Sequence, residues 1–414
     1  MNEDVDVAII GAGAAGLAAA VKAREAGAGS VVVIDRNPDP GGILPQCIHT
    51  GFGLHYFQEN LTGPEYVTRF IEKAKQLGVR FKMDTMVLNI RPDRSLFAAN
   101  SDEGLISMKP RALALAMGCR ERTRGAIGIP GSRPAGIFTA GTAQRLMDVE
   151  GYMLGSRIVI LGSGDVGMIM ARRFSLEGAK VEAVVEMLPY PGGLPRNVVQ
   201  CLEDFEIPLL LGHTVTSILG IDRVSGVVIA RLDENGTPLR GTQRTLECDT
   251  LVLSVGLIPE NELSEGAGLR MDPATGGPVV DERMQTSGDG IFACGNVVHV
   301  HDLVDHVTET GIKAGEGAAL FAADRLPPLT KRIPVVPGSG VRYVVPQIVS
   351  GDNPVTLFLR VKSPVRNAKL NVGSFTVPMR VARPAETVSV KLTEERVRTL
   401  TEEKEIPVSL EATP

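Results

Sequence analysis

Two stretches of the chain carry one pattern: VAIIGAGAAGLAAAVKAREAGAGSVVVIDRNPDPGG at residues 7–42 and IVILGSGDVGMIMARRFSLEGAKVEAVVEMLPYPGG at residues 158–193. The offset between them is 151 residues, which is 158 minus 7. At this offset the glycines, an acid and the closing Pro-Gly-Gly coincide: Gly11 with Gly162, Gly13 with Gly164, Gly16 with Gly167, Gly27 with Gly178, Asp35 with Glu186, Pro40 with Pro191, and Gly41 and Gly42 with Gly192 and Gly193. The sequence therefore predicts one structural unit that is present twice.

Each copy predicts a strand, a tight glycine turn, a helix and a second strand. The Val- and Ile-rich runs suit buried parallel strands, and the GxGxxG that follows suits the turn. The first glycine allows the turn, the second leaves room for a pyrophosphate, and the third lets helix and strand pack closely. The helix N-terminus would then face the phosphates, and the acid at the end of the second strand would bind a ribose. Both copies therefore predict dinucleotide binding.

Composition limits the class of protein. The chain has 414 residues, 43% of them hydrophobic, with 43 Lys and Arg against 48 Asp and Glu, so its formal net charge is −5. This length predicts two or three globular domains, and the acidic balance argues against nucleic-acid binding. An acidic N-terminus and an apolar run at 7–21 that glycines interrupt predict neither a signal peptide nor a membrane span. The five cysteines are far apart, which argues against a disulfide framework or a zinc site and favours the reducing cytoplasm.

Three further segments extend the pattern. They are ALALAMGCRER at 112–122, TLVLSVGLIPENEL at 250–263 and TSGDGIFACGNVVHV at 286–300. With the two repeats, they resemble the pyridine nucleotide-disulfide oxidoreductase superfamily of two-dinucleotide flavoproteins over about residues 5–325. The resemblance implies that the first repeat binds FAD, the second binds NAD(P)H, and the chain then returns to complete the FAD domain.

The expected fold class is α/β, with two Rossmann-like FAD- and NAD-binding domains, the NAD domain inserted in the FAD domain, and a small C-terminal β-rich domain. The expected domains are 1–122 with 249–326 for FAD, 123–248 for NAD(P), and 327–414 for the β-rich part. Expected FAD-binding residues are Gly11, Gly13, Ala14, Ala15, Gly16, Asp35, Arg36, Gly41, Gly42, Ile43, Gln46, Val87, Gly118, Gly295 and Asn296. Expected NAD-binding residues are Gly162, Gly164, Asp165, Val166, Gly167, Glu186 and Gly256.

Particular residues refine these expectations. Glu186 is followed by Met187 and Leu188, with no nearby arginine to receive a 2′-phosphate, so the second site should prefer NAD to NADP. In the first site, Arg36 is expected to lie over the adenine. Asn296 stands where the resembled family usually has Asp, so binding is retained through hydrogen bonds while the side-chain charge near the flavin diphosphate is lost.

The loop after the first Gly-Gly reads GGILPQCIHTGFGLHYF and lacks the family's redox CxxxxC pair. A dithiol relay is therefore not expected. In the resembled fold this loop runs along the isoalloxazine, so Cys47 is either a single redox thiol or an ordinary small buried residue. His49, with Gln46 and His55 in the same loop, is either a proton donor or acceptor for the flavin or a histidine satisfied by backbone. Cys47 and His49 are the candidate catalytic residues.

A second polar cluster comprises His299, His301, Asp302, Asp305 and His306. A helix that begins near His301 would place Asp302 and His306 on one face. That spacing permits a metal, but no HExxH-like motif is present, and no metal site is expected. The alternatives are a helix-capping role for Asp302, or contact with a substrate or with a neighbouring protomer.

The C-terminal part changes character. Prolines at 327, 328, 334 and 337 indicate a linker, and VTLFLRVKS at 355–363 and SFTVPMRVA at 374–382 predict a small antiparallel sheet. Residues 331–414 hold 13 Lys and Arg and 8 Asp and Glu, a net charge of +5, which leaves −10 for the rest. This part is either a solvated β domain or a module that docks an acidic partner protein or protomer.

The loop GGILPQCIHTGFG and the segment MRVARPAE narrow the resemblance to the FAD/NAD-binding subunit found beside bacterial glycerol-3-phosphate dehydrogenase, and to α-type subunits of opine oxidases and hydrogen cyanide synthase. The resemblance implies hydride exchange between NAD(H) and flavin, with electrons passed to or from a partner flavoprotein. A stand-alone NADH oxidase or single-cysteine disulfide reductase, and a non-catalytic FAD-bearing scaffold, remain alternatives. The sequence leaves open whether the chain forms homo- or hetero-oligomers.

Overall fold

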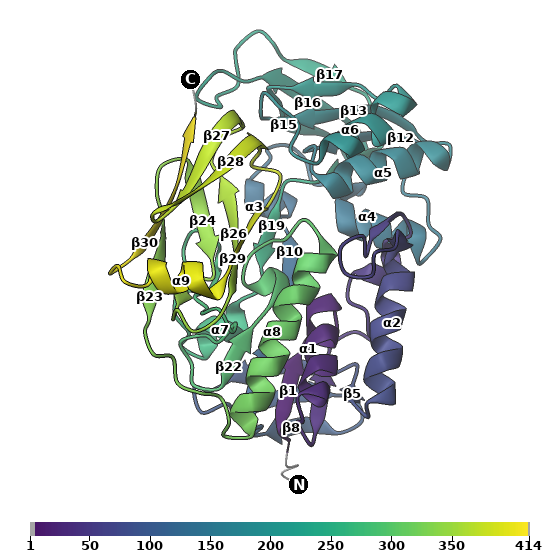
Figure 1. The fold of residues 1–414 in the computed structure, drawn as a ribbon. Coiled ribbons are helices and arrows are strands. Elements are labelled where there is room, and N and C mark those ends of the chain that lie inside the picture. The colour runs from purple at the N-terminus through teal and green to yellow at the C-terminus, as the bar shows by residue number, and fades with distance from the viewer. Residues whose placement is uncertain (1–4, 413–414) are drawn as a thin grey trace. The chain divides into compact units, whose positions relative to one another are not determined.

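The computed structural model describes residues 5–412. The chain divides into two compact units (Figure 1): the first comprises the chain up to Cys119 and from Pro259 onward, and the second comprises Arg120–Ile258. The second unit is therefore an insertion, entered at residues 119/120 and left at 258/259. The division into three domains, with its boundaries at 122, 248 and 326, stays a prediction.

The first unit is built on a five-stranded parallel sheet. Its strand order is β22-β9-β1-β2-β5, and every neighbouring pair is parallel. Four of the five strands consist only of buried residues, because helices and loops cover both faces of the sheet. The strands are β1 (Val7–Ile10), β2 (Val31–Ile34), β5 (Arg80–Lys82), β9 (Ala112–Leu115) and β22 (Ile291–Ala293).

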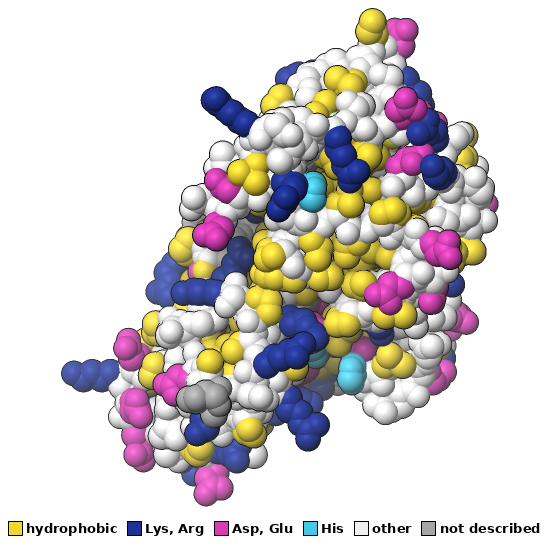
Figure 2. Space-filling view, turned by 90° about the horizontal axis from the view of Figure 1, so that it is seen from above, with side chains coloured by type: hydrophobic (Ala, Val, Ile, Leu, Met, Phe, Trp, Pro, Cys, Tyr) yellow, Lys and Arg dark blue, Asp and Glu magenta, His cyan; other side chains and the backbone are white. Residues whose placement is uncertain are grey.

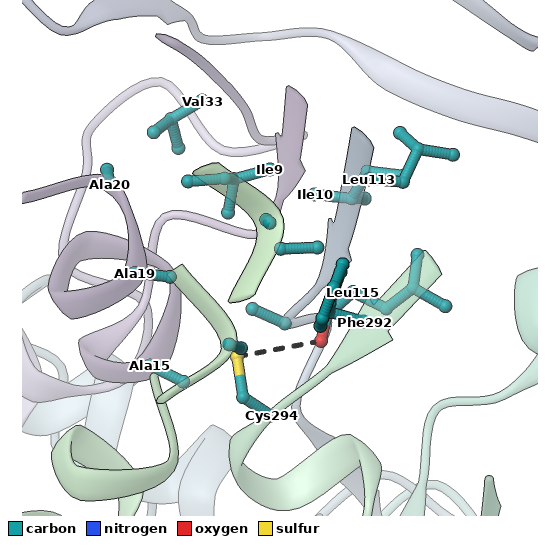
Figure 3. Close-up of a cluster of buried hydrophobic side chains, with 14 of the residues drawn as sticks. Ile9, Ile10, Ala15, Ala19, Ala20, Val33, Leu113, Leu115, Phe292 and Cys294 are labelled. Atoms are coloured by element: carbon teal, nitrogen blue, oxygen red, sulfur yellow. Dashed lines mark hydrogen bonds between the residues drawn. The ribbon is translucent and has the colours of Figure 1, made fainter. Parts of the chain in front are cut away.

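The three longest helices of this unit are α1 (Ala14–Glu25), α2 (Gly63–Gln76) and α8 (Val304–Ala322). Helices α1 and α8 lie side by side in close contact (Figure 1). Figure 3 shows Ala15, Ala19 and Ala20 of α1 beside the strand residues Ile9 and Val33, and the Cys294 thiol near Leu115. The small side chains of α1 let the helix lie close to the sheet, which fixes the start of α1 relative to the end of β1.

The second unit repeats the architecture. Its sheet has the order β11-β18-β12-β13-β14, again parallel throughout. The strands are β11 (Ile137–Thr139), β12 (Arg157–Leu161), β13 (Lys180–Glu186), β14 (Leu209–Leu211) and β18 (Thr250–Leu253). The helices are α3 (Arg124–Ile127), α4 (Ala140–Asp148), α5 (Asp165–Leu176) and α6 (Pro195–Cys201). An antiparallel sheet of β15 (His213–Gly220), β16 (Val224–Arg231) and β17 (Arg244–Leu246) completes the unit.

The two sheets confirm the predicted α/β fold of two Rossmann-like units. Strands β1, β2, β5 and β9 occupy the same sheet positions as β12, β13, β14 and β18. The fifth strand differs in origin, since β22 comes last in the first unit whereas β11 precedes β12 in the second. The repeat in the sequence is therefore also present in the structure, at the point where a glycine turn follows the central strand of each sheet.

Smaller elements complete the first unit. An antiparallel sheet contains β6 (Met86–Ile90), β7 (Leu96–Asn100) and β8 (Gly104–Met108). The remaining short elements are β3 (Thr50–Phe52), β4 (Leu61–Thr62), β20 (Met271–Asp272), β21 (Gly277–Pro278), α7 (Glu262–Gly266) and the 3-10 helices η1 (Leu44–Gln46) and η3 (Gly295–Val297). Strands β10 (Cys119–Glu121) and β19 (Leu257–Pro259) contain the two crossings between units.

The C-terminal part is rich in β-structure, as predicted, but it holds two sheets rather than one. The first contains β23 (Ile333–Pro337), β25 (Ile348–Val349), β27 (Val365–Val372), β28 (Phe375–Ala382) and β30 (Ile406–Ala412). The second contains β24 (Val341–Val345), β26 (Val355–Val361) and β29 (Val388–Leu392), and helix α9 (Glu394–Leu400) precedes β30. The expectation that Pro334 and Pro337 belong to a linker was wrong: both lie in β23, where Val335 supplies an N–H to Gln347.

Candidate functional site

The first glycine turn joins β1 to α1. Gly11 has a φ of +106°, and a Cβ on it would lie 2.3 Å from the carbonyl oxygen of Ala116, so only glycine fits. Gly13 is the N-cap of α1 and makes no side-chain cap. The first amide groups of α1 are therefore in the position where a helix N-terminus binds phosphate. This geometry fits the pyrophosphate of a dinucleotide.

Asp35 follows β2 and ties the glycine turn to the next loop. Its carboxylate accepts hydrogen bonds from the Ala12 N–H at 2.7 Å and from the backbone N–H and side-chain amide of Asn37 at 2.9 and 3.0 Å. A carboxylate has about four acceptor sites, so Asp35 retains capacity for a ribose hydroxyl. Arg36 beside it is exposed and pairs with Glu260 at 3.4 Å.

The second unit repeats the backbone hydrogen bonds of this arrangement. Glu186 Oε2 accepts from the backbone N–H and the hydroxyl of Ser163 at 2.8 and 2.6 Å, and Oε1 accepts from the Leu188 N–H at 2.9 Å. The offset of 151 residues maps Ala12 onto Ser163, Asp35 onto Glu186 and Asn37 onto Leu188. The structural equivalence therefore reaches the individual hydrogen bonds.

Two serines of the second site were missed by the sequence analysis. The Ser163 hydroxyl also accepts from the Gly192 N–H at 2.7 Å, and the Ser254 hydroxyl accepts from the Gly167 N–H at 3.1 Å. A comparison of the two repeats at the position after the first glycine would have singled out Ser163. Ser254 follows β18, far along the chain, and no local pattern marks it.

The other expected NAD residues lie around this turn. Asp165 begins α5, followed by Val166, and its Oδ1 accepts from the Leu194 N–H at 2.8 Å and the Asn197 amide at 2.6 Å. Asp165 therefore holds the start of α6 against the glycine turn. Gly256 has a φ of +101°, and its carbonyl accepts from the Arg122 N–H at 3.0 Å.

The Gly-Gly pair packs directly on the first glycine turn. The Gly41 N–H donates to the Ala12 carbonyl at 2.8 Å, and a Cβ on Gly42 would lie 2.9 Å from the Gly13 Cα. Ile43 is 56% exposed at this point, whereas Gln46 in η1 is buried. The loop that begins here is thus held at the face of the glycine turn where a bound dinucleotide would lie.

The two candidate catalytic residues differ in exposure. Cys47 is buried, its thiol lies 3.4 Å from the Ile43 carbonyl, and its own carbonyl accepts from the Gly63 N–H at 2.9 Å. His49 is half-buried, with Nδ1 3.0 Å from the Thr50 carbonyl and its ring tilted against that of Phe52, the two centroids 5.1 Å apart. Both lie in the loop that the Gly-Gly pair positions, and their catalytic role stays a prediction.

The segment after β22 brings further expected FAD residues together. In η3, the Gly295 N–H donates to the Thr310 hydroxyl at 3.0 Å. Asn296 accepts from the His301 N–H at 2.9 Å through Oδ1 and donates through Nδ2 to the Cys119 thiol at 3.5 Å. Gly118 has a φ of +75° and precedes that cysteine. Val87, by contrast, is buried among apolar side chains in β6.

The histidine cluster is buried beside Phe358 of the C-terminal part. The His299 and His301 rings are 3.9 Å apart, and the His306 ring is 6.4 Å from that of His301. Within residues 5–412, buried ring nitrogens without a hydrogen-bond partner include His299 Nε2, both nitrogens of His301, and His306 Nδ1. Burial lowers the pKa of His299 to about 3 and holds the pKa of His301 well below its usual value, so both rings are neutral.

Asp302 does not cap a helix. Helix α8 begins at Val304, later than expected, and Asp302 instead pairs with Arg360 and accepts from the Thr387 N–H at 2.5 Å. The capping expectation was wrong because both partners lie in the C-terminal part, far away in sequence. No group of three or more His, Cys, Asp or Glu side chains within residues 5–412 is arranged to hold a metal ion.

Asp305, in the first turn of α8, anchors the loop that carries the candidate catalytic residues. Its carboxylate accepts from the backbone N–H groups of His55 and Tyr56 at 3.2 and 3.3 Å. The loop is therefore fixed both at its Gly-Gly end and at α8.

In the described part of the chain, no helix is long and apolar enough to span a membrane.

Comparisons with known proteins agree with this geometry. An opine oxidase component from Agrobacterium tumefaciens is 24% identical over 72% of this chain and 62% of its own length. The glutamate synthase [NADPH] small chain of Escherichia coli is 29% identical over 75% and 67%, and hydrogen cyanide synthase subunit HcnB of Pseudomonas protegens is 25% identical over 75% and 67%. The chain thus spans about three-fifths to two-thirds of the length of these relatives.

A solved structure shows the same fold. Thioredoxin reductase of T. acidophilum superposes with a TM-score of 0.64 and 24% identity, over 78% of this chain and 99% of that one. The model of the pyridine nucleotide-disulphide oxidoreductase family matches residues 5–315, which include both glycine turns, Asp35 and Glu186, and the start of α8. The chain therefore belongs to the pyridine nucleotide-disulphide oxidoreductase family, whose members are FAD-dependent NAD(P)H oxidoreductases.

Proposed function

We propose that the chain exchanges hydride between NAD(H) and a bound FAD, and passes electrons to or from a partner flavoprotein. The repeated carboxylate carries this proposal. Asp35 and Glu186 each bridge the residue after the first glycine of their turn and the residue two positions further along their own loop. Two sites for dinucleotides in one chain are what an enzyme needs if its two cofactors are to react with each other.

The first unit supplies the groups that FAD requires. The turn at residues 11–16 and the α1 N-terminus would bind the pyrophosphate, and Asp35 would bind the ribose. The loop at 41–46, Gly118 and Asn296 would position the flavin. When bound, the two cofactors supply the hydride chemistry, while the chain orients them and excludes water.

The second unit favours NAD over NADP. Glu186 would accept a hydrogen bond from a ribose hydroxyl, and its negative charge would repel a 2′-phosphate. Met187 next to it is exposed and uncharged. The cofactor of the second site is therefore proposed to be NADH.

The loop around Cys47 and His49 is the proposed route to the partner. Four large apolar side chains of this loop are 41–56% exposed: Ile43, Ile48, Leu54 and Tyr56. Figure 2 shows hydrophobic side chains exposed on one face among basic and acidic ones. Apolar contact is thus the recognition mode best supported. Two relatives bear the word subunit in their names, and a glycerol-3-phosphate dehydrogenase-like flavoprotein is the partner that the sequence resemblance suggests.

Separate loss of each cofactor tests this assignment. Purified protein should be yellow and should retain FAD through gel filtration. Asp35→Ala should raise the FAD dissociation constant about tenfold or more, because a charge-assisted hydrogen bond contributes about 1.5–3 kcal/mol. Asp93→Ala, in an exposed turn, is the matched control. Wild-type protein that neither contains FAD nor takes it up would refute the proposal.

A stand-alone NADH oxidase or single-cysteine disulfide reductase is a second candidate, because Cys47 lies five residues after Gly42 in the loop that would contact the flavin. That candidate predicts that Cys47→Ser abolishes turnover with NADH and oxygen or with a disulfide. Cys201→Ser, at a buried thiol of the second unit, is the control. Full activity of Cys47→Ser would exclude the single-cysteine mechanism and favour transfer to a partner.

A further inference from the structure

Arg360 of β26 links the C-terminal part to the segment that follows η3. Its guanidinium donates to the Tyr343 hydroxyl at 3.0 Å, the Pro384 carbonyl at 2.6 Å and the Val300 carbonyl at 3.2 Å, and it pairs with Asp302. Both charged side chains are largely buried, at 14% and 13% exposed. A buried pair with this many hydrogen bonds fixes geometry, since losing any partner leaves a polar group unsatisfied.

Two hydrogen bonds of Arg360 hold the residues on either side of His301. Val300 and Asp302 stand on either side of His301, and Asp302 is also held by the Thr387 N–H at 2.5 Å. The His301 ring is packed against His299 and Phe358. With both neighbours and the ring held, the position of the His301 backbone N–H is determined by the C-terminal part.

That N–H decides which way the Asn296 amide faces. It donates to Asn296 Oδ1 at 2.9 Å, so the oxygen points toward His301 and the NH₂ group toward the other side. The NH₂ group has two hydrogens, and one donates to the Cys119 thiol. An amide can present either its oxygen or its nitrogen to a ligand, and the His301 N–H selects the nitrogen.

We infer that Arg360 is a positioning residue for the flavin, acting through the segment 300–302 and Asn296. This inference rests on the proposed binding of FAD beside Asn296. The C-terminal part would thus have a role in cofactor binding. Among Arg360, the segment 300–302 and Asn296, only Asn296 would touch FAD. Arg360 would set the direction of a hydrogen-bond donor without itself contacting the cofactor.

A second contact of the C-terminal part provides the comparison. The Ser350 hydroxyl and N–H donate to Glu282, a contact that does not involve residues 296–302. Ser350→Ala therefore weakens the attachment of the C-terminal part and leaves the Asn296 contacts intact. A merely structural role of Arg360 would give the same result as this variant.

The test uses the full-length protein reconstituted with FAD, and measures the FAD dissociation constant and the visible circular dichroism of the bound flavin. Arg360→Met should weaken FAD binding about tenfold, the loss expected for one buried hydrogen bond, and should alter the dichroism. Ser350→Ala should stay within about twofold of wild type. In an Asn296→Ala background, Arg360→Met should add less than about twofold, because the residue through which it acts is gone.

Asp302→Ala removes the other member of the Arg360–Asp302 pair. It replaces Arg360→Met in the test if that variant does not fold. Equal effects of Arg360→Met and Ser350→Ala would overturn the inference. So would an undiminished effect of Arg360→Met in the Asn296→Ala background. Wild-type protein that binds no FAD would instead refute the proposed function, which is a different and earlier failure.

Discussion

Two carboxylates, Asp35 and Glu186, make equivalent hydrogen bonds to backbone N–H groups in the two units, but they differ in their side-chain partners and in their burial. Glu186 also accepts from the Ser163 hydroxyl, whereas Ala12 at the equivalent position of the first unit has no such group. Glu186 is also the more buried of the two. Asp35 in turn accepts from the Asn37 side-chain amide, for which Leu188 offers no equivalent, so each acid has one side-chain donor of its own.

Replacing Glu186 tests this residue directly. Glu186→Gln should lower kcat/KM for NADH about tenfold, because the glutamine amide carries no charge and has one acceptor oxygen, so it cannot accept from both the Ser163 and the Leu188 N–H groups. The ratio of NADH to NADPH efficiency should fall, since the repulsion of a 2′-phosphate is removed. Steady-state kinetics with both nucleotides measure this.

Glu182→Gln is the matched control, since Glu182 lies on the same strand but pairs with Arg157 and Lys180. Its nucleotide preference should equal that of the wild type. An unchanged preference in Glu186→Gln would show that the second site does not read the ribose through this acid.

The close approach of α1 and α8 connects the glycine turn to the segment that closes the first unit. Two glycines of α8 make it feasible: a Cβ on Gly311 would lie 2.4 Å from the Ala15 carbonyl, and one on Gly315 would lie 2.2 Å from the Ala19 carbonyl. Any side chain at these positions forces the helices apart. The α8 N-terminus, next to Asn296, would move with them.

Gly315→Ala should therefore destabilise the protein by about 1–3 kcal/mol, despite the higher helix propensity of alanine. Chemical denaturation followed by far-ultraviolet circular dichroism measures the change. In Gly125→Ala of α3 the new Cβ has ordinary contacts, the nearest at 3.8 Å, so this control should not lose stability. Equal stability of Gly315→Ala and wild type would contradict the packing described.

The parts of the fold that follow local patterns could be predicted from the sequence. The two glycine turns, their strands and Asp35 and Glu186 lie within a single run of about 36 residues each, so their spacing carries the information. Other features depend on contacts between residues far apart in the chain. They are the hydrogen bond of Ser254, the ion pair of Asp302 with Arg360, and the different origin of the fifth strand, which is β22 in the first sheet and β11 in the second. The strand β23 was mistaken for a linker because its prolines mask the pattern, although their carbonyls remain available for pairing.

In the molecule as a whole, the C-terminal part belongs to the same compact unit as the first glycine turn. The neutral rings of His299 and His301 pack against Phe358 of this part, with His306 half-buried beside them. The charged groups around them are Arg360 and Asp302, with Asp305, Glu309 and His55 near His306. The attachment of the C-terminal part should therefore depend on pH.

The sign follows from the lowered pKa values. An unfolded histidine has a pKa of about 6.5, whereas His299 in the folded protein has a pKa of about 3. The stability contribution is complete above about pH 6.5 and is lost as the pH falls toward 3, by about 1.4 kcal/mol per pH unit for each such histidine. Urea unfolding between about pH 7 and pH 5 should show this decline.

Substitution separates the cluster from other acid effects. His299→Gln should make the decline shallower, because it removes one group that takes up a proton on unfolding. His213→Gln, in the second unit, is the matched control. If both variants decline as steeply as wild type, the cluster does not determine acid stability.

Two dinucleotide sites in one chain should allow NADH to reduce a bound flavin. Anaerobic titration of the purified holoprotein with NADH, followed by visible absorption, tests it most directly. The flavin band should bleach to completion with stoichiometric NADH, and Glu186→Gln should need more NADH for the same bleaching. A flavin that stays oxidised under excess NADH, in protein that holds FAD, would show that NADH does not reduce the flavin of this protein.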